Sequence, residues 1–209
     1  GISIPYLNVD YSFAPNSSVR LYEQTFDFET INLTDVKAGT QATIDGTISH
    51  KYFDNWVLDL DVDTNNNRFL ILDTEFDEDQ LFYGTGFLNG TGRIYGPTTA
   101  LNIDVLGSTA KGTSLKIPLS DVASLGDYSF INFVSKSKKN NATEERVLKD
   151  YQGLELKFDL DITPDAEVEI VTDQKTKSSL KGTGAGTILM QINTRGKFEM
   201  FGDFVVVTG

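Results

Sequence analysis

LKGTGAGTILMQINTRGKFEMFGDFVVVTG, residues 180–209, is the stretch that decides the fold of this chain. Its apolar residues fall at every second position on both sides of a Thr-Arg-Gly turn at 194–196, which is typical of two strands that share one buried face. Glycines at 182, 184 and 186 leave the approach to the first strand without side chains, as a bend or a close approach of two backbones requires. The residues expected on the buried face are Ile188, Met190, Ile192, Phe198, Met200, Phe204 and Val206.

The same period of two runs through much of the remaining chain. It is clearest over 154–162, where apolar residues alternate with charged ones, and it recurs over 42–48. In segment 56–63 three aliphatic residues are expected inward and three aspartates outward. The other elements predicted are strands over 4–9, 18–21, 26–28, 101–106, 113–119, 130–134 and 168–170, a hairpin of 82–88 with 91–95, a polar loop over 135–141 and one short surface helix over 141–153.

The composition excludes several classes of protein. The chain has 209 residues, with 18 Lys and Arg against 30 Asp and Glu, and its net charge is −12. This acidic balance argues against binding to a nucleic-acid backbone and against simple adsorption to anionic lipid. The chain has no cysteine, which excludes disulfides and thiolate metal sites. It has no signal peptide and no apolar run near the roughly 20 residues of a spanning helix, so we expect a fragment whose targeting segment and continuation lie elsewhere.

No catalytic or metal-binding constellation emerges from the residue types. His50 is the only histidine, and we expect it to be a surface residue or a satisfied structural one rather than a catalytic base. The run from Asp61 through Asp63 to Asn65 is similar to the start of a calcium loop, but Asn66 and Leu72 stand where an EF-hand needs glycine and glutamate. We therefore interpret it as an acidic strand face leading into an Asn-rich turn, and predict no enzyme activity, metal or cofactor.

Assembled, the pattern predicts an all-β protein of roughly twelve to sixteen short strands with one apolar face and one acidic face. Two arrangements bury such a face. Two sheets pack on each other in a sandwich, or one long antiparallel or mixed sheet curls on itself. The alternation alone does not distinguish them, and the sandwich is the commoner arrangement.

Three stretches resemble the C-terminal region of the TamB family. The first resembles the family's C-terminal signature. It consists of the spaced glycines at 182–186, the alternating strand, Thr-Arg-Gly at 194–196 and KFEMFGDF at 197–204. The glycine-punctuated block over 83–119 is similar to its repeating-strand segment, and ITPDAEVEIVTD at 162–173 is a third match. The resemblance is diffuse over 2–79. TamB proteins are long envelope proteins of Gram-negative bacteria, within the AsmA-like group of bridge-type lipid-transfer proteins.

The resemblance implies a fold and a function. It implies a single β-groove domain over 1–209, in which a curled, taco-like sheet has an apolar concave face. It also implies a segment of a periplasmic bridge that moves phospholipid between the inner and outer membranes and aids outer-membrane protein assembly through a β-barrel partner. The full-length protein is then anchored in the inner membrane outside this segment. The groove residues expected to touch acyl chains are Leu58, Leu60, Val62, Leu156, Phe158, Leu160, Ile162, Ile188, Met190, Ile192, Phe198 and Met200.

A second hypothesis is a cell-surface binding or adhesion module built as a closed β-sandwich. Asn-rich turns and four Asn-x-Ser/Thr sequences, at Asn16, Asn32, Asn89 and Asn141, are compatible with it. Phospholipid that co-purifies with the protein would indicate the bridge, and a dry core would indicate the module.

Overall fold

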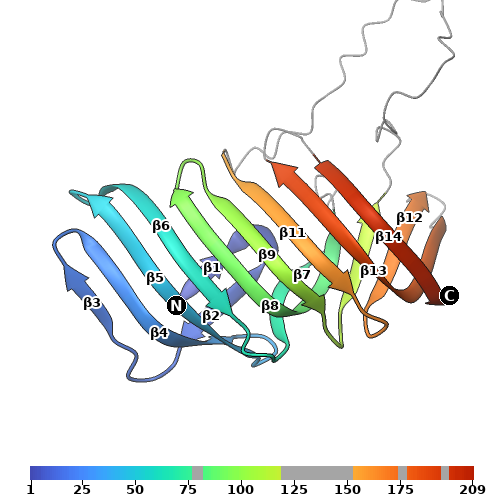
Figure 1. The fold of residues 1–209 in the computed structure, drawn as a ribbon, viewed down its shortest axis with the longest axis horizontal. Helices are drawn as coiled ribbons and strands as arrows, with labels where there is room; N and C mark the ends of the chain where they lie inside the picture. The colour runs from blue at the N-terminus through green and yellow to red at the C-terminus, as the bar shows by residue number, and fades with distance from the viewer. Residues whose placement is uncertain (77–81, 119–152, 174–177, 194–197) are drawn as a thin grey trace, which may run out of the picture.

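The computed structural model describes residues 1–76, 82–118, 153–173, 178–193 and 198–209, and these form a single 14-stranded mixed sheet with one short 3-10 helix (Figure 1). An all-β fold with a long mixed sheet is therefore confirmed. The strand expected over 130–134, the loop over 135–141, nearly all of the helix over 141–153 and the turn at 194–196 lie outside the described residues. The elements are β1 (Ile2–Ile4), η1 (Pro5–Leu7), β2 (Val9–Phe13), β3 (Val19–Tyr22), β4 (Thr25–Asp35), β5 (Gln41–Lys51), β6 (Asp54–Asp63), β7 (Phe69–Thr74), β8 (Tyr83–Pro97), β9 (Asn102–Thr109), β10 (Ser114–Pro118), β11 (Glu155–Ile162), β12 (Glu167–Asp173), β13 (Ser178–Asn193) and β14 (Phe198–Thr208).

The sheet is folded over on itself along a crease. Strands β6 and β7 both pair with β8 along one edge, and β9 and β10 both pair with its other edge. Strands β11 and β12 run parallel to β9 and β10 and pair with two successive parts of β13. Each of the pairs β6–β7, β9–β10 and β11–β12 thus occupies one position in the strand order and is interrupted at the crease. Strands β8 and β13 instead cross the crease without interruption.

The crease divides the sheet into two walls. The first wall contains β4, β5, β6, β9, β11 and β14 with the C-terminal parts of β8 and β13. The second wall contains β7, β10 and β12 with the N-terminal parts of β8 and β13. Figure 1 shows β1, β2 and β7 behind the layer formed by β5, β6, β8 and β9. The apolar core lies between the walls.

Threonine hydroxyls replace ladder hydrogen bonds at the crease. The Thr64 hydroxyl accepts from the Gly90 amide at 2.9 Å, between β6 and β8. The Thr109 hydroxyl accepts from the Thr163 amide at 2.8 Å, and the Thr163 hydroxyl donates to the Thr109 carbonyl at 2.9 Å. A hydroxyl can both donate and accept. These side chains therefore satisfy main-chain groups where the strands turn, which would otherwise be costly to bury.

The predicted hairpin of 82–88 with 91–95 is wrong, because β8 runs without a turn from Tyr83 to Pro97. Gly90 faces Gly107 directly across the β8–β9 pair. A Cβ atom on Gly90 would overlap the main-chain oxygen of Leu106, so this glycine permits a close approach of two backbones rather than a reversal of the chain.

Other element boundaries also differ from the sequence-based expectation. The strand predicted over 4–9 is wrong in its middle, because β1 ends at Ile4 and a 3-10 helix spans Pro5–Leu7. Proline suits the first turn of a helix, where its missing N–H is not needed. Asn8 then adopts a left-handed conformation, with φ 53°, before β2 begins. The strand predicted over 26–28 is the start of the longer β4, which continues beyond a register shift between Phe28 and Ile31.

Candidate functional site

Two apolar rows run across the inner face of the first wall. The residues of each row are direct partners in successive strand pairs, from β4 to β14. Eight strands spaced at about 4.8 Å make each row about 34 Å long. The first row is Ile31, Ile44, Val62, Gly92, Val105, Phe158, Met190 and Met200. The second row is Phe28, Gly46, Leu60, Ile94, Ile103, Leu156, Ile192 and Phe198.

The expected shared face of β11, β13 and β14 is confirmed by these pairs, but Val206, which was expected to be buried, is 59% exposed. Phe158 is the partner of Met190, and Met190 is the partner of Met200. Leu156 likewise faces Ile192, and Leu160 faces Ile188. Since side chains alternate across a strand, direct partners lie on one side of the sheet.

Most residues predicted for the groove are buried between the walls. Leu58, Val62 and Ile188 are half-buried and pack against the buried core. Met200 is 41% exposed, and Phe198 is placed by its backbone pairing alone. The buried ones are Leu60, Leu156, Phe158, Leu160, Ile162, Met190 and Ile192.

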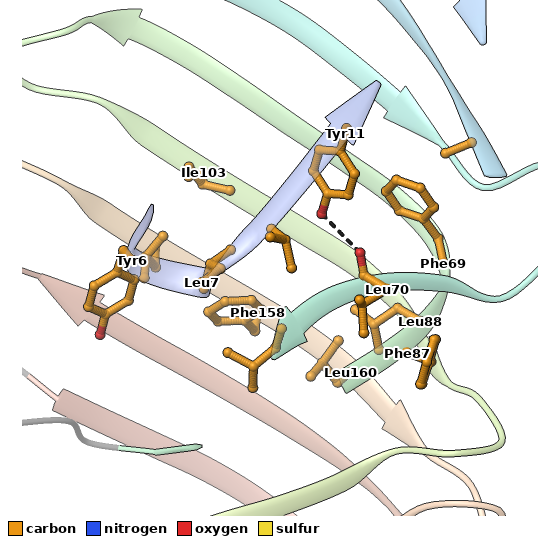
Figure 2. Close-up of a cluster of buried hydrophobic side chains, with 14 of the residues drawn as sticks. Tyr6, Leu7, Tyr11, Phe69, Leu70, Phe87, Leu88, Ile103, Phe158 and Leu160 are labelled. Atoms are coloured by element: carbon orange, nitrogen blue, oxygen red, sulfur yellow. Dashed lines mark hydrogen bonds between the residues drawn. The ribbon is translucent and has the colours of Figure 1, made fainter. Parts of the chain in front are cut away.

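The N-terminal segment, residues 2–13, covers the inner face of the first wall; we call it the strap. Figure 2 shows Leu7 close to Phe158 and the Tyr11 side chain directed toward β7. Strand β2 pairs with β4, and β1 pairs back on β2. Tyr11 also stacks on Phe69, with ring centroids 4.8 Å apart. The strap thereby covers the inner face of the first wall from β5 to β11.

The contact between the strap and β7 is made by side chains. The Tyr11 hydroxyl donates to the Leu70 carbonyl at 2.9 Å (Figure 2), and the Asn8 amide donates to the Asp73 carbonyl at 2.6 Å. Lys37 pairs with the Asp73 carboxylate at 2.6 Å. Burial, with the nearby Asp35 and Asp10, raises the pKa of Tyr11. Tyr11 is therefore held as a neutral hydrogen-bond donor.

Small apolar cavities lie in the interior, and Leu7 borders two of them. One, of about 80 Å³, lies between the strap and the first wall, lined among others by Ile4, Leu7 and Val105. The other, of about 50 Å³, lies deeper between the walls and is also bordered by Leu7. Since a single water needs about 10–15 Å³ measured in this way, the first has room for about five to eight water-sized groups and the second for about three to five, far fewer than an acyl chain of sixteen carbons. The interior is filled by the protein's own side chains.

Several core residues were not among the sequence-based candidates. Val9 and Tyr11 alternate with Asp10 and Ser12, so their period of two was a usable signal. The apolar run in β7 does not alternate, because the register shifts between Leu70 and Leu72 and both residues are buried. The core residues outside the candidate list include Val9, Tyr11, Leu33, Ile44, Phe69, Leu70, Leu72 and Ile103.

The outer face of the first wall carries the charges. Asp61, Arg93, Asp104 and Lys157 are successive partners across β6, β8, β9 and β11. A hydrogen bond to Asp59, 3.1 Å from Arg93, raises the pKa of the Arg93 guanidinium. Such exposed pairs contribute little to stability. Their consequence is a polar surface on the opposite side of the wall from the apolar rows.

His50 and the acidic turn have structural partners. His50 is buried beside Phe53 and Trp56, and its Nδ1 accepts from the Phe53 amide at 3.0 Å. This confirms the satisfied structural role. The Asp63 carboxylate accepts from the Asn65 amide at 2.7 Å, and Asn65 is left-handed, as expected for an Asn-rich turn. Within the described residues no group of three or more His, Asp and Glu side chains is arranged to hold a metal ion.

Comparison with known proteins identifies the family. The model of the TamB C-terminal domain matches residues 29–209. Neither the curated proteins nor the solved structures gave a significant match. Among the described residues no helix has the length and apolar character needed to cross a membrane. Because the family model covers most of the sequence, the chain belongs to the TamB C-terminal domain family, a structural and transport family of the Gram-negative envelope.

Proposed function

We propose that this domain is a segment of a periplasmic bridge that shields acyl chains and moves phospholipid between the inner and outer membranes. The observation that carries the proposal is the pair of apolar rows across the first wall, each backed by a charged outer face. Membership of the TamB family supports it. In this proposal the full-length protein is anchored in the inner membrane, and it also aids outer-membrane protein assembly through a β-barrel partner.

The energetics of burial suit transport rather than storage. An acyl chain of sixteen carbons gains about 12 kcal/mol on leaving water, at about 0.8 kcal/mol per methylene. Moving the same chain from a bilayer to an equally apolar groove leaves its free energy nearly unchanged. Lipid can therefore pass along the rows without being trapped.

The experiment compares charges on the two faces of the sheet. Met200 lies at the end of the first row and is 41% exposed, whereas Leu189 is 37% exposed on the outer face of the neighbouring strand. Since neither side chain is buried, both Met200→Asp and Leu189→Asp should leave the protein folded. Native mass spectrometry and lipid extraction of detergent-free protein then measure bound phospholipid.

We expect phospholipid on the parent protein and on Leu189→Asp, and at least tenfold less on Met200→Asp, because a passing chain would have to desolvate the new carboxylate. Protein that never carries phospholipid, even after incubation with vesicles, would overturn the proposal and favour a closed binding module. Equal lipid on the two variants would overturn the assignment of the rows.

A further inference from the structure

We propose that the strap occupies the place of an acyl chain, and that lipid enters the first wall by displacing the strap at its contact with β7. This inference rests on the proposed function, and it adds the step by which a filled interior becomes a groove.

The strap fills the interior with apolar side chains, in the place where an acyl chain would put its methylene groups. Its side chains Leu7, Val9 and Tyr11 are buried, and Leu7 borders both interior cavities. The first cavity lies directly between strap residues and Val62 and Val105 of the first apolar row. Removing the strap would therefore uncover the rows and join the first cavity to the space that the strap vacates.

The strap is held more weakly than the strands of the wall. Strand β2 pairs with β4 at three residues and β1 with β2 at three, against eight residue pairs between β5 and β6. No strand pairing joins β2 to β7 among the described residues. Elements with short ladders open at a lower free-energy cost than the central strands of a sheet.

The edge of β7 that faces the strap is satisfied by side chains. The Leu70 amide donates to the Thr40 hydroxyl at 2.9 Å. The carbonyls of Leu70 and Asp73 accept from Tyr11 and Asn8 of the strap. When the strap leaves, these two carbonyls face the opening and can be hydrated. Opening at β7 breaks their two side-chain hydrogen bonds and the 3.2 Å hydrogen bond from Lys37, which pairs with Asp73, to the Asn8 carbonyl. Displacement of the strap also separates the three residue pairs of β2 and β4.

A disulfide lock tests the displacement. The chain has no cysteine, so an introduced pair is the only one. Ser12 of the strap is the direct partner of Thr34 in β4, and antiparallel partners have Cα atoms about 4.5–5.5 Å apart, within the range of a disulfide. Ser12→Cys with Thr34→Cys therefore fixes the strap. The matched control, Thr47→Cys with Asp59→Cys, joins partners of β5 and β6 and leaves the strap free.

The readout is labelling by phosphatidylcholine that carries a photoreactive group on its acyl chain, presented in phosphatidylcholine vesicles. We expect oxidation to lower labelling of the strap pair at least tenfold, dithiothreitol to restore it, and the control pair to label equally in both states. Equal labelling of the oxidised and reduced strap pair would overturn the strap inference while the proposed function stands. Absence of labelling in every form would instead overturn the proposed function.

Hydrogen exchange tests the opening without lipid. We expect the amides of β2 to exchange at least tenfold faster than those of the β5–β6 pair, and the oxidised lock to slow them. Exchange of β2 as slow as that of β5 would overturn the inference, because a strap that opens only with the whole protein is not a separate element.

Discussion

The Tyr11 hydroxyl donates a 2.9 Å hydrogen bond to the main-chain oxygen of Leu70, fifty-nine positions along the chain. Burial of this hydroxyl, and the charges of Asp35 and Asp10, raise the pKa of Tyr11. A raised pKa in the folded state means that the contribution of Tyr11 to stability is present below the unfolded pKa, about 10. That contribution is lost as the pH rises from there toward the folded pKa.

We expect Tyr11→Phe to lower the free energy of unfolding by about 1–3 kcal/mol near neutral pH, because the Leu70 carbonyl loses its partner in a buried place. Above pH 10 the difference should shrink. The parent protein then loses stability because its phenol ionises more readily in the unfolded state, whereas the Phe variant has no phenol to ionise. Urea unfolding at pH 8, 10 and 11 measures both effects. A difference that stays constant with pH would contradict the assignment.

Met190→Asp should severely destabilise the protein. Met190 is 4% exposed and lies between Phe158 and Met200 in the first row. A buried carboxylate without a partner costs several kcal/mol. The volume-conserving control Met190→Leu should cost less than about 1.5 kcal/mol. Thermal unfolding compares the two, and an unchanged melting temperature for Met190→Asp would mean that the interior around this residue is open to water.

Two glycines of the same strand should respond oppositely to alanine. A Cβ on Gly90 would overlap the Leu106 oxygen, whereas on Gly92 the nearest atoms would lie at 3.9 and 4.0 Å. We expect Gly90→Ala to destabilise by about 2 kcal/mol or more, because β8 and β9 must separate. Gly92→Ala should be neutral or stabilising by about 0.5 kcal/mol. Chemical denaturation measures both, and equal effects would argue against a close approach at the crease.

The outer edge of β14 has no strand partner among the described residues, and both of its faces are apolar, with Val205 and Val207 exposed on one and Val206 on the other. Unpaired apolar edges recruit other strands, so we expect the protein to associate through this edge. Val207→Lys should reduce association in sedimentation velocity. Val36→Lys is the control, because Val36 is likewise 64% exposed but lies in the turn after β4. Sedimentation as a monomer at all concentrations would contradict the prediction.

The register of the C-terminal strands could be predicted from sequence, but the crease could not. Alternation over 154–162 and 188–192 placed Phe158 and Met190 on one face, because a period of two leaves only two choices. The turn residues at 163–165 do not distinguish a reversal of the chain from a crease within one strand, since both need the same local conformations. The parallel pairing of β9 with β11 joins residues separated by about fifty positions, which no local pattern specifies.

The strap was missed for a related reason. Tyr11 and Val9 alternate like any half-buried strand, but their burial depends on Phe69 and Leu70, which are far away in the chain. Pro5 lies within the strand predicted over 4–9, whereas it starts a short 3-10 helix within the strap. The alternation therefore identified residues that pair along one face of the sheet, while the residues that cover that face were not identified.

The crease has a consequence for how such a molecule can change in size. The chain keeps its position in the strand order as it crosses the crease. The width of the folded sheet therefore depends on how many residues each strand has on either side of the crease. The length depends only on how many strands are stacked, at about 4.8 Å each. Duplicating a strand together with its crease would lengthen the sheet and leave its width unchanged. The length and the width of the folded sheet are thus independent in this architecture, and evolution can change one without changing the other.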